Sequence, residues 1–179
     1  MMARRAVRLF ALVASVCGVW FAASPAGATG DRPASAKGTL EQGVLSNINA
    51  LRGQHGLAPL RFSSRLSAAA RAHSNDMAAR GYFSHTSANG SSFHRRIARF
   101  YPMGRSRYWS VGENLLWSSP DVAPADALRM WLRSPPHRKN LLTSRWREIG
   151  LSAIHVTSGP GVFKNAPVTV LTADFGVRR

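Results

Sequence analysis

Two histidines and one glutamate are the residues of this chain whose types best suit chemistry at a protein site. They are His85, Glu113 and His137. Two neutral imidazoles and a carboxylate make a partial ligand shell for zinc or a similar divalent ion, with positions left for water or a ligand. A metal held in this way lowers the pKa of bound water and supports hydrolysis. The three residues are 28 and 24 positions apart, so only the fold can bring them together.

Structural roles are an open alternative for each of these residues. His85 could cap the preceding helix or hydrogen-bond to a carbonyl group. Glu113 could belong to a buried hydrogen-bonded or ionic network that holds the sheet to His137 without a metal, because a partly buried carboxylate needs a partner. His137 follows two prolines and could act only as a helix-start residue. We expect Asn114 to support the backbone around Glu113.

The other polar residues favour simpler interpretations. His73 falls on the apolar stripe of a predicted helix, which indicates a core histidine rather than a ligand. Ser84 has no activating base and acid in the sequence pattern, so a nucleophile is not expected. Five arginines close together in the sequence predict a solvated basic face, with contact to anionic lipid or polymer as the alternative. They are Arg95, Arg96, Arg99, Arg105 and Arg107.

The elements that must position these side chains follow from hydrophobic periodicity. Apolar residues at helical intervals and N-cap serines predict four helices and one helical turn, over residues 40–54, 64–80, 92–100, 121–133 and 137–142. Extended apolar patterns predict three strands, over residues 109–117, 148–156 and 168–175. Helices come first and strands mostly last, without βα alternation. This order favours an α+β domain with helices packed on an antiparallel sheet.

The N-terminal residues differ in composition from the rest of the chain. Three arginines precede an uncharged apolar run, and an A-x-A sequence follows at residues 26–28. This order predicts a signal peptide over residues 1–28, with a retained membrane anchor as the alternative. Residues 29–38 are small and polar and predict a flexible leader, so one domain over residues 39–179 is expected. The single cysteine, Cys17, lies in the apolar run, so the mature chain has no disulfide.

Net charge narrows the range of partners. The sequence carries 24 Lys and Arg against 8 Asp and Glu. Removal of residues 1–28 takes away three arginines and leaves 21 basic residues, a formal net charge of +13. This charge favours anionic lipid or cell-envelope polymer as a partner, and it is equally compatible with a role in solubility. No motif for nucleic-acid binding is present, so no nucleic acid is expected.

Several short segments together resemble the bacterial branch of the CAP superfamily, which comprises cysteine-rich secretory, antigen 5 and pathogenesis-related 1 proteins. They are Phe83–Thr86, Gly112–Leu115, Trp131 with Ser134–Leu142, Glu148–Gly150 and Asp174–Gly176. The resemblance implies an α-β-α sandwich, with a central antiparallel sheet between helical layers. It also implies a cleft in which His85, Glu113 and His137 converge. Many members carry a second glutamate where this chain has Ser134, so any mechanism that needs two acids is in doubt.

The resemblance also implies a class of function. Family members have been linked to the binding of sterols, fatty acids and other lipids. We therefore expect a secreted, monomeric binding module for a lipid or another small amphipathic ligand, located outside the cell or in the cell envelope. The cleft of His85, Glu113 and His137, with Asn114 beside it, would hold a divalent ion such as zinc. One alternative is a metal-assisted hydrolase acting on peptide or cell-envelope material, with Glu113 as a base or metal ligand. Another is a basic envelope-attachment protein.

Overall fold

The computed structural model describes residues 35–179, with side chains from Leu40 onward. The predicted signal peptide and residues 29–34 of the predicted leader lie outside this range. Within residues 35–179, no helix is long and apolar enough to cross a membrane.

The helices follow the predicted pattern, with shifted ends. They are α1 (Ser35–Gln54), α2 (Ser64–Arg80), α3 (Phe93–Phe100), α4 (Pro124–Leu132), α5 (Pro135–Leu141) and the short 3-10 helix η1 (Gly161–Phe163). α1 begins before its predicted start, inside the segment predicted as a leader, and no proline between Ser35 and Gln54 interrupts it. α4 begins at Pro124 and α5 at Pro135. Proline favours the first helical turn, so the predicted helix break at Pro135 is also the start of the next helix.

The sheet contains one strand that was not predicted. Its strands are β1 (Arg61–Phe62), β2 (Trp109–Ser118), β3 (Glu148–Gly159) and β4 (Ala166–Arg178), in the order β1-β3-β4-β2. The three long strands pair antiparallel, as predicted. β1 pairs parallel with β3 over two residues, so the antiparallel sheet has one short parallel pair at its edge. A strand of two residues is too short to show an alternating pattern.

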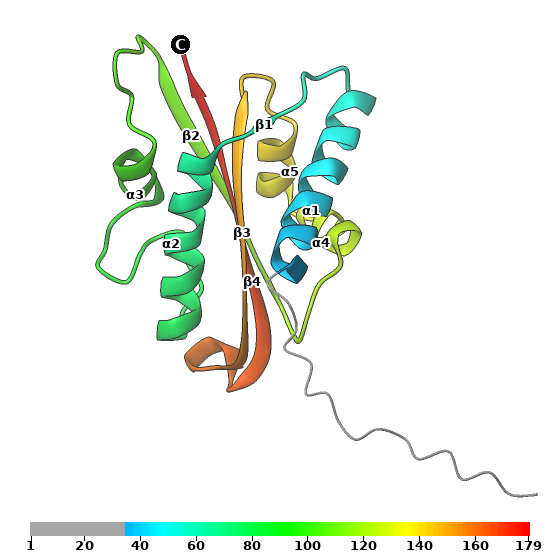
Figure 1. Cartoon of the computed structure of the whole chain (residues 1–179), viewed down its shortest axis with the longest axis vertical. Coiled ribbons are helices and arrows are strands. Elements are labelled where there is room, and N and C mark those ends of the chain that lie inside the picture. Colours follow the sequence, from blue (N-terminus) through cyan, green and yellow to red (C-terminus); the bar gives the residue numbers. More distant parts are fainter. Residues whose placement is uncertain (1–34) are drawn as a thin grey trace, which may run out of the picture. The chain divides into compact units, whose positions relative to one another are not determined.

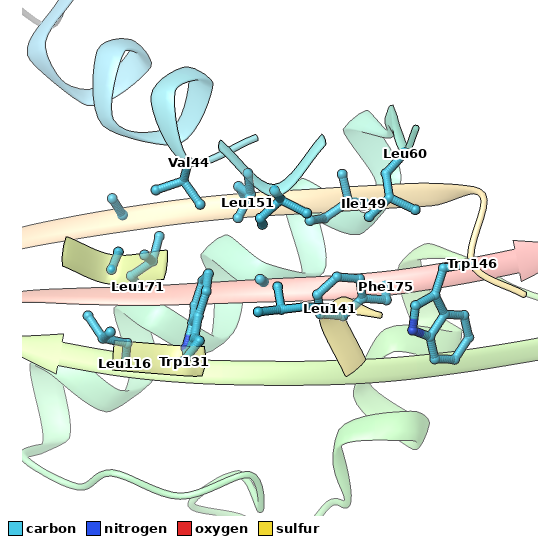
Figure 2. Packing of buried hydrophobic residues seen from close by; sticks show 14 of the residues in the cluster. Val44, Leu60, Leu116, Trp131, Leu141, Trp146, Ile149, Leu151, Leu171 and Phe175 are labelled. Atoms are coloured by element: carbon cyan, nitrogen blue, oxygen red, sulfur yellow. The ribbon is translucent and has the colours of Figure 1, made fainter. Parts of the chain in front are cut away.

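Helices cover both faces of the sheet, which confirms the predicted α-β-α sandwich. α2 and α3 lie against one face, and α1, α4 and α5 lie against the other (Figure 1). The larger core fills the space between the sheet and α1, α4 and α5, where Trp131 and Leu141 lie over the strands (Figure 2). Two smaller clusters, around Met77 and Leu66, attach α2 and α3 to the first face. Alternate residues of each strand therefore serve opposite cores.

Two glycines allow α2 to end and to approach the sheet. Gly81 follows the helix with φ 68°, in the left-handed conformation that glycine adopts without strain. Gly150 of β3 lies under the start of α2, where an added Cβ would be 2.1 Å from the backbone atoms of Leu66 and Ser67. The Glu148–Gly150 segment noted in the sequence thus contains the contact point between α2 and β3.

Candidate functional site

The three predicted site residues meet at an edge of the sheet. One comes from the edge strand, and the other two come from opposite sides of the sheet. Glu113 lies in β2, the last strand in the sheet order. His85 lies in the loop between α2 and α3, whereas His137 lies in α5 on the other side of the sheet (Figure 1). The two imidazoles approach each other at this edge, with ring centroids 6.5 Å apart. The fold therefore brings together residues that are far apart in the sequence.

Both carboxylate oxygens of Glu113 are occupied within this cluster. Its side chain is fully buried. Oε1 accepts a hydrogen bond of 2.7 Å from Nδ1 of His85, and Oε2 pairs with Nη2 of Arg96. Because His85 donates through Nδ1, its Nε2 is the ring nitrogen left for a ligand. The His85 side chain is 49% exposed, so solvent reaches this part of the cluster.

The backbone of His137 is held in place by a hydrogen-bonded pair of asparagines. Nδ2 of Asn114 donates to the backbone oxygen of His137 at 3.1 Å, and Asn140 donates to Oδ1 of Asn114 at 2.9 Å. Asn140 also donates to the backbone oxygen of Glu113 at 3.0 Å. Asn114 is fully buried and fixes the start of α5 to β2. Burial and the neighbouring His85 lower the pKa of His137, which favours the neutral ring at neutral pH.

Asp174 adds a second carboxyl group next to Glu113, on the neighbouring strand. It lies opposite Glu113 on β4 and is fully buried. No nitrogen or hydroxyl donor among the described residues reaches either of its side-chain oxygens. Burial and the charge of Glu113 raise its pKa well above the ordinary value, although Arg96 opposes this shift. The neutral carboxylic acid is therefore the favoured form of Asp174.

Arg96 and Asp174 are members of the cluster that the sequence interpretation missed. Arg96 was predicted on a solvated basic face, and this was wrong, because the residue is only 6% exposed. It lies on the same helical face as Phe93 and Ile97, and that position was the available signal. Asp174 was noted only as part of a motif. Its signal was a carboxylate in the middle of an apolar strand.

The other polar candidates have the simpler roles expected of them. His73 is fully buried, and its Nε2 donates to the backbone oxygen of Ser84 at 2.8 Å. His94 is exposed. The hydroxyl of Ser84 accepts a hydrogen bond from the backbone of Thr86 at 3.1 Å, which is a local turn contact.

The donor set only partly fits a divalent metal. Glu113 is already occupied by an imidazole and a guanidinium, and the arginine's charge opposes a cation at that carboxylate. Over residues 35–179, no three side chains of the His, Cys, Asp and Glu types are grouped as metal ligands. Of the three predicted residues, only His85 and His137 would then be left to hold an ion. The contact from His85 to Glu113 is the carboxylate–histidine pairing that commonly orients a metal-binding imidazole.

A groove lies at the opposite edge of the sheet. Its volume is about 360 Å³, and its walls come from α1, α2, β1 and β3. β1 covers only the first residues of β3, so the edge of β3 is open beyond Ile149. Ser67 accepts a hydrogen bond from the backbone N–H of Leu151, and Glu41 accepts one from that of Ala153. These side chains satisfy two backbone N–H groups at the open edge of β3, and apolar side chains line much of the surrounding groove.

The sandwich and the histidine–glutamate cluster at its edge together define a CAP-type domain. The model of the cysteine-rich secretory protein family, CAP, matches residues 45–175. The chain belongs to this family.

Two curated relatives come from Bacillus subtilis strain 168. The uncharacterized membrane protein YlbC is 35% identical over 113 residues, which are 63% of this chain and 31% of that protein. The uncharacterized protein YkwD is 35% identical over 119 residues, which are 66% of this chain and 43% of that protein. The match thus spans less than half the length of either relative.

Solved structures from other bacteria share the fold. An extracellular protein of Bacillus anthracis that contains an SCP domain has a TM-score of 0.63 and 26% identity, over 87% of this chain and 45% of that one. An outer surface protein of Borrelia burgdorferi has a TM-score of 0.61 and 20% identity, over 78% of this chain and 93% of that one. The second likeness concerns the fold alone.

Proposed function

We propose that this chain is an exported binding module that takes a small apolar or amphipathic ligand in the groove at the open edge of β3. The observation that carries the proposal is the groove itself. A volume of about 360 Å³ lies within the range of small-molecule pockets. Its lining is more apolar than those of two other cavities in the described part of the chain.

The walls of the groove suit an apolar chain with a polar end. Leu45, Leu151 and Ile154 contribute aliphatic surface from α1 and β3. Phe62 of β1 is 60% exposed, although aromatic side chains usually bury most of their surface. Arg71 of α2 also lines the groove and offers a cation to an acidic head group. A fatty acid has both of these features.

Binding of a fluorescent fatty acid, with a matched pair of variants, tests this proposal. Phe62→Ser removes an aromatic wall of the groove, whereas Phe83→Ser removes another exposed phenylalanine that does not line it. We expect saturable binding to the native protein, at least fivefold weaker binding to Phe62→Ser, and native binding to Phe83→Ser. Equal affinity in both variants, or no saturable binding to the native protein, contradicts the proposal.

Export is supported by the predicted signal peptide and by the settings named for the structural relatives. One of those relatives is described as extracellular and another as an outer surface protein. Fractionation of cells that express the full chain tests this part. We expect the protein in the medium or envelope, shortened by about 28 residues, as the predicted cleavage site requires. Full-length protein in the cytosolic fraction contradicts it.

A divalent ion at the histidine pair is a second proposal. The His85–Glu113 hydrogen bond of 2.7 Å favours it, because this bond orients Nε2 of His85 for a ligand. A bound zinc ion would act as a Lewis acid there and would take its remaining ligands from water or substrate. The chain's own residues would orient the imidazoles. Hydrolysis of peptide or envelope material depends on this ion and is the alternative activity.

Attachment to the envelope by charge is a third proposal, motivated by the formal charge of +13 that remains after cleavage. Retention of the protein on isolated envelopes at increasing salt concentration tests it, because salt screens contacts between exposed charges. We expect retention that falls with salt and is unchanged by His85→Ala with His137→Ala. Retention that is absent or insensitive to salt contradicts the proposal.

A further inference from the structure

Arginines gather at one end of the sheet. β2 and β3 begin at this end and β4 finishes there, because Trp109 pairs with Arg178 and Glu148 pairs with Gly176. Figure 1 shows the end of β4 together with the connections that lead into β2 and β3. Six arginines lie in these segments, and we call them the arginine face: Arg105, Arg107, Arg145, Arg147, Arg178 and Arg179.

The charge of the arginine face is not balanced within the described part of the protein. The connections over residues 101–108 and 142–147 contain no acidic residue. Glu148 begins β3 beside them, and it accepts a hydrogen bond from the hydroxyl of Tyr101. No arginine of the face forms an ion pair with a described acidic side chain. Five of the six are exposed, and Arg178 is partly exposed, so their charge is presented to the surroundings.

The opposite end of the sheet does not share this charge. The connections there, over residues 119–123 and 160–165, contain one aspartate, Asp121, and one lysine, Lys164. Positive charge that served only solubility would need no such separation along the molecule. The separation favours a partner of negative charge that meets the arginine face.

Two large apolar side chains extend from the same connection as Arg105 and Arg107. Met103 is 45% exposed and Tyr108 is 38% exposed. Met103 begins a turn that a hydrogen bond of 3.2 Å from the N–H of Ser106 closes. The boundary of a lipid bilayer accepts methionine and tyrosine side chains beside arginines, whereas a soluble polyanion would use the charge alone. The combination therefore favours a bilayer.

Hydrogen bonds fix this connection against the end of β4. Tyr108 and Arg179 exchange two backbone hydrogen bonds, of 2.7 and 3.1 Å. Nη1 of Arg178 donates to the backbone oxygen of Pro102 at 3.3 Å. The guanidinium of Arg178 also lies 3.9 Å from the centroid of the Tyr101 ring. The surface is thus formed before a partner arrives, which lowers the entropic cost of binding.

We propose that the arginine face docks the protein on a lipid bilayer that contains anionic lipid, with Met103 and Tyr108 at the level of the head groups. The arginines attract the lipid phosphates, and the two apolar side chains enter the boundary of the acyl region. The inference rests on the proposed attachment by charge, because it names the surface and the partner for that attachment. It does not depend on a ligand in the groove at β3, which none of these residues lines.

Co-sedimentation with lipid vesicles tests the proposal. The purified protein is mixed, at constant ionic strength, with vesicles of phosphatidylcholine or with vesicles of equal parts phosphatidylcholine and phosphatidylglycerol. We expect binding to the anionic vesicles to be at least about tenfold stronger, and to weaken as salt is added. Equal binding to the two kinds of vesicle, or no binding to either, overturns the proposal.

Two double variants of equal charge separate the arginine face from net charge. Arg105→Gln with Arg107→Gln removes two charges from the face, and Arg133→Gln with Lys164→Gln removes two exposed charges elsewhere. The first pair should weaken binding to anionic vesicles roughly tenfold or more, as expected when two arginines leave a membrane contact, and the second by less than about twofold. Equal effects indicate attraction by net charge and overturn the face.

Two exposed methionines test whether a side chain enters the bilayer. Met103 lies in the proposed contact, whereas Met130 of α4 is 40% exposed and lies outside it. Met103→Ser should weaken vesicle binding about twofold to fivefold, because it removes apolar surface from the boundary, and Met130→Ser should leave it unchanged. Equal binding of the two variants overturns docking on a bilayer, since charge alone would then account for the contact.

Isolated envelopes separate this inference from the proposals on which it rests or beside which it stands. Retention on envelopes that falls with salt, without binding to anionic vesicles, overturns the bilayer as partner and leaves attachment to an anionic polymer. Binding to anionic vesicles that Arg105→Gln with Arg107→Gln weakens supports the inference, whatever the fluorescent fatty acid does. The same double variant should bind the fatty acid as the native protein does, because neither arginine lines the groove.

Discussion

Glu113 and Asp174 lie directly opposite each other on β2 and β4, and both are buried beside the guanidinium of Arg96. Ionisation of both neighbouring carboxyl groups is unfavourable, because their negative charges repel each other. Glu113 has a hydrogen-bonded imidazole and the arginine as partners, whereas no nitrogen or hydroxyl donor in the described part of the chain reaches Asp174. Burial and the neighbouring carboxylate raise the pKa of Asp174, so the neutral acid is its favoured form.

Arg96→Gln should destabilise the protein strongly. The substitution leaves the buried carboxylate of Glu113 without its cation, and loss of one partner of a buried ion pair costs about 3–5 kcal/mol. Chemical denaturation measures the free energy of unfolding. Arg95→Gln is the control, because Arg95 is exposed on the same helix and should change stability by less than about 0.5 kcal/mol. A similar small effect at Arg96 would show that the ion pair contributes little.

Asp174→Asn should change how stability depends on pH. The folded protein raises the pKa of Asp174 above its ordinary value of 3.8, so the folded chain keeps a proton that the unfolded chain releases as pH rises. The stability contributed by Asp174 is therefore complete below about pH 4 and is lost as pH rises toward the folded-state pKa. Asparagine does not titrate, so the variant does not lose stability through this residue as pH rises. Unfolding curves from about pH 4 to pH 8 should diverge, with the variant increasingly the more stable, and parallel curves would contradict the assignment.

Gly150→Ala should disrupt the contact between α2 and β3. An added Cβ would lie 2.1 Å from backbone atoms of Leu66 and Ser67, which cannot move without shifting the helix. We expect a loss of about 1–3 kcal/mol or more, as for other overpacked sites. Gly53→Ala is the control, because nothing lies within 4 Å of its added Cβ. Thermal unfolding of both variants gives the comparison, and equal melting temperatures would contradict the close approach.

Zinc should bind through the histidine pair and more weakly than in a structural zinc site, because only two protein ligands are present. Calorimetry on the native protein and on His85→Ala with His137→Ala measures this. Binding should disappear in the double variant and persist in His55→Ala, which removes an exposed histidine elsewhere. If the double variant binds zinc as the native protein does, the ion does not use this pair.

Local patterns predicted the elements of the fold well, because periodicity and end signals belong to single segments. α2 is an example, because it was predicted over residues 64–80 and spans Ser64–Arg80. β1 was missed because a strand of two residues exists only through its pairing with β3. Similarly, the resemblance identified Glu113 and the two histidines as a cluster, but no local pattern could identify their partners.

Arg96 shows why the site was only partly predictable. Its neighbours Arg95 and Arg99 are exposed, and a row of arginines is usually solvated. The burial of Arg96 depends on Glu113, which lies 17 positions away on another element. A charged residue on the apolar face of a short helix was the one local indication that a buried partner existed.

The groove at the open edge of β3 is the centre of the proposed function, and methyl NMR of the protein during titration with a fatty acid tests it most directly. We predict saturable shifts in the methyl signals of Leu45, Leu151 and Ile154, which line the groove. The methyl signals of Leu141 and Val177, in the core on the other side of the sandwich from α2, should stay in place. Shifts confined to other residues, or no saturable shift at all, would contradict a ligand site in this groove.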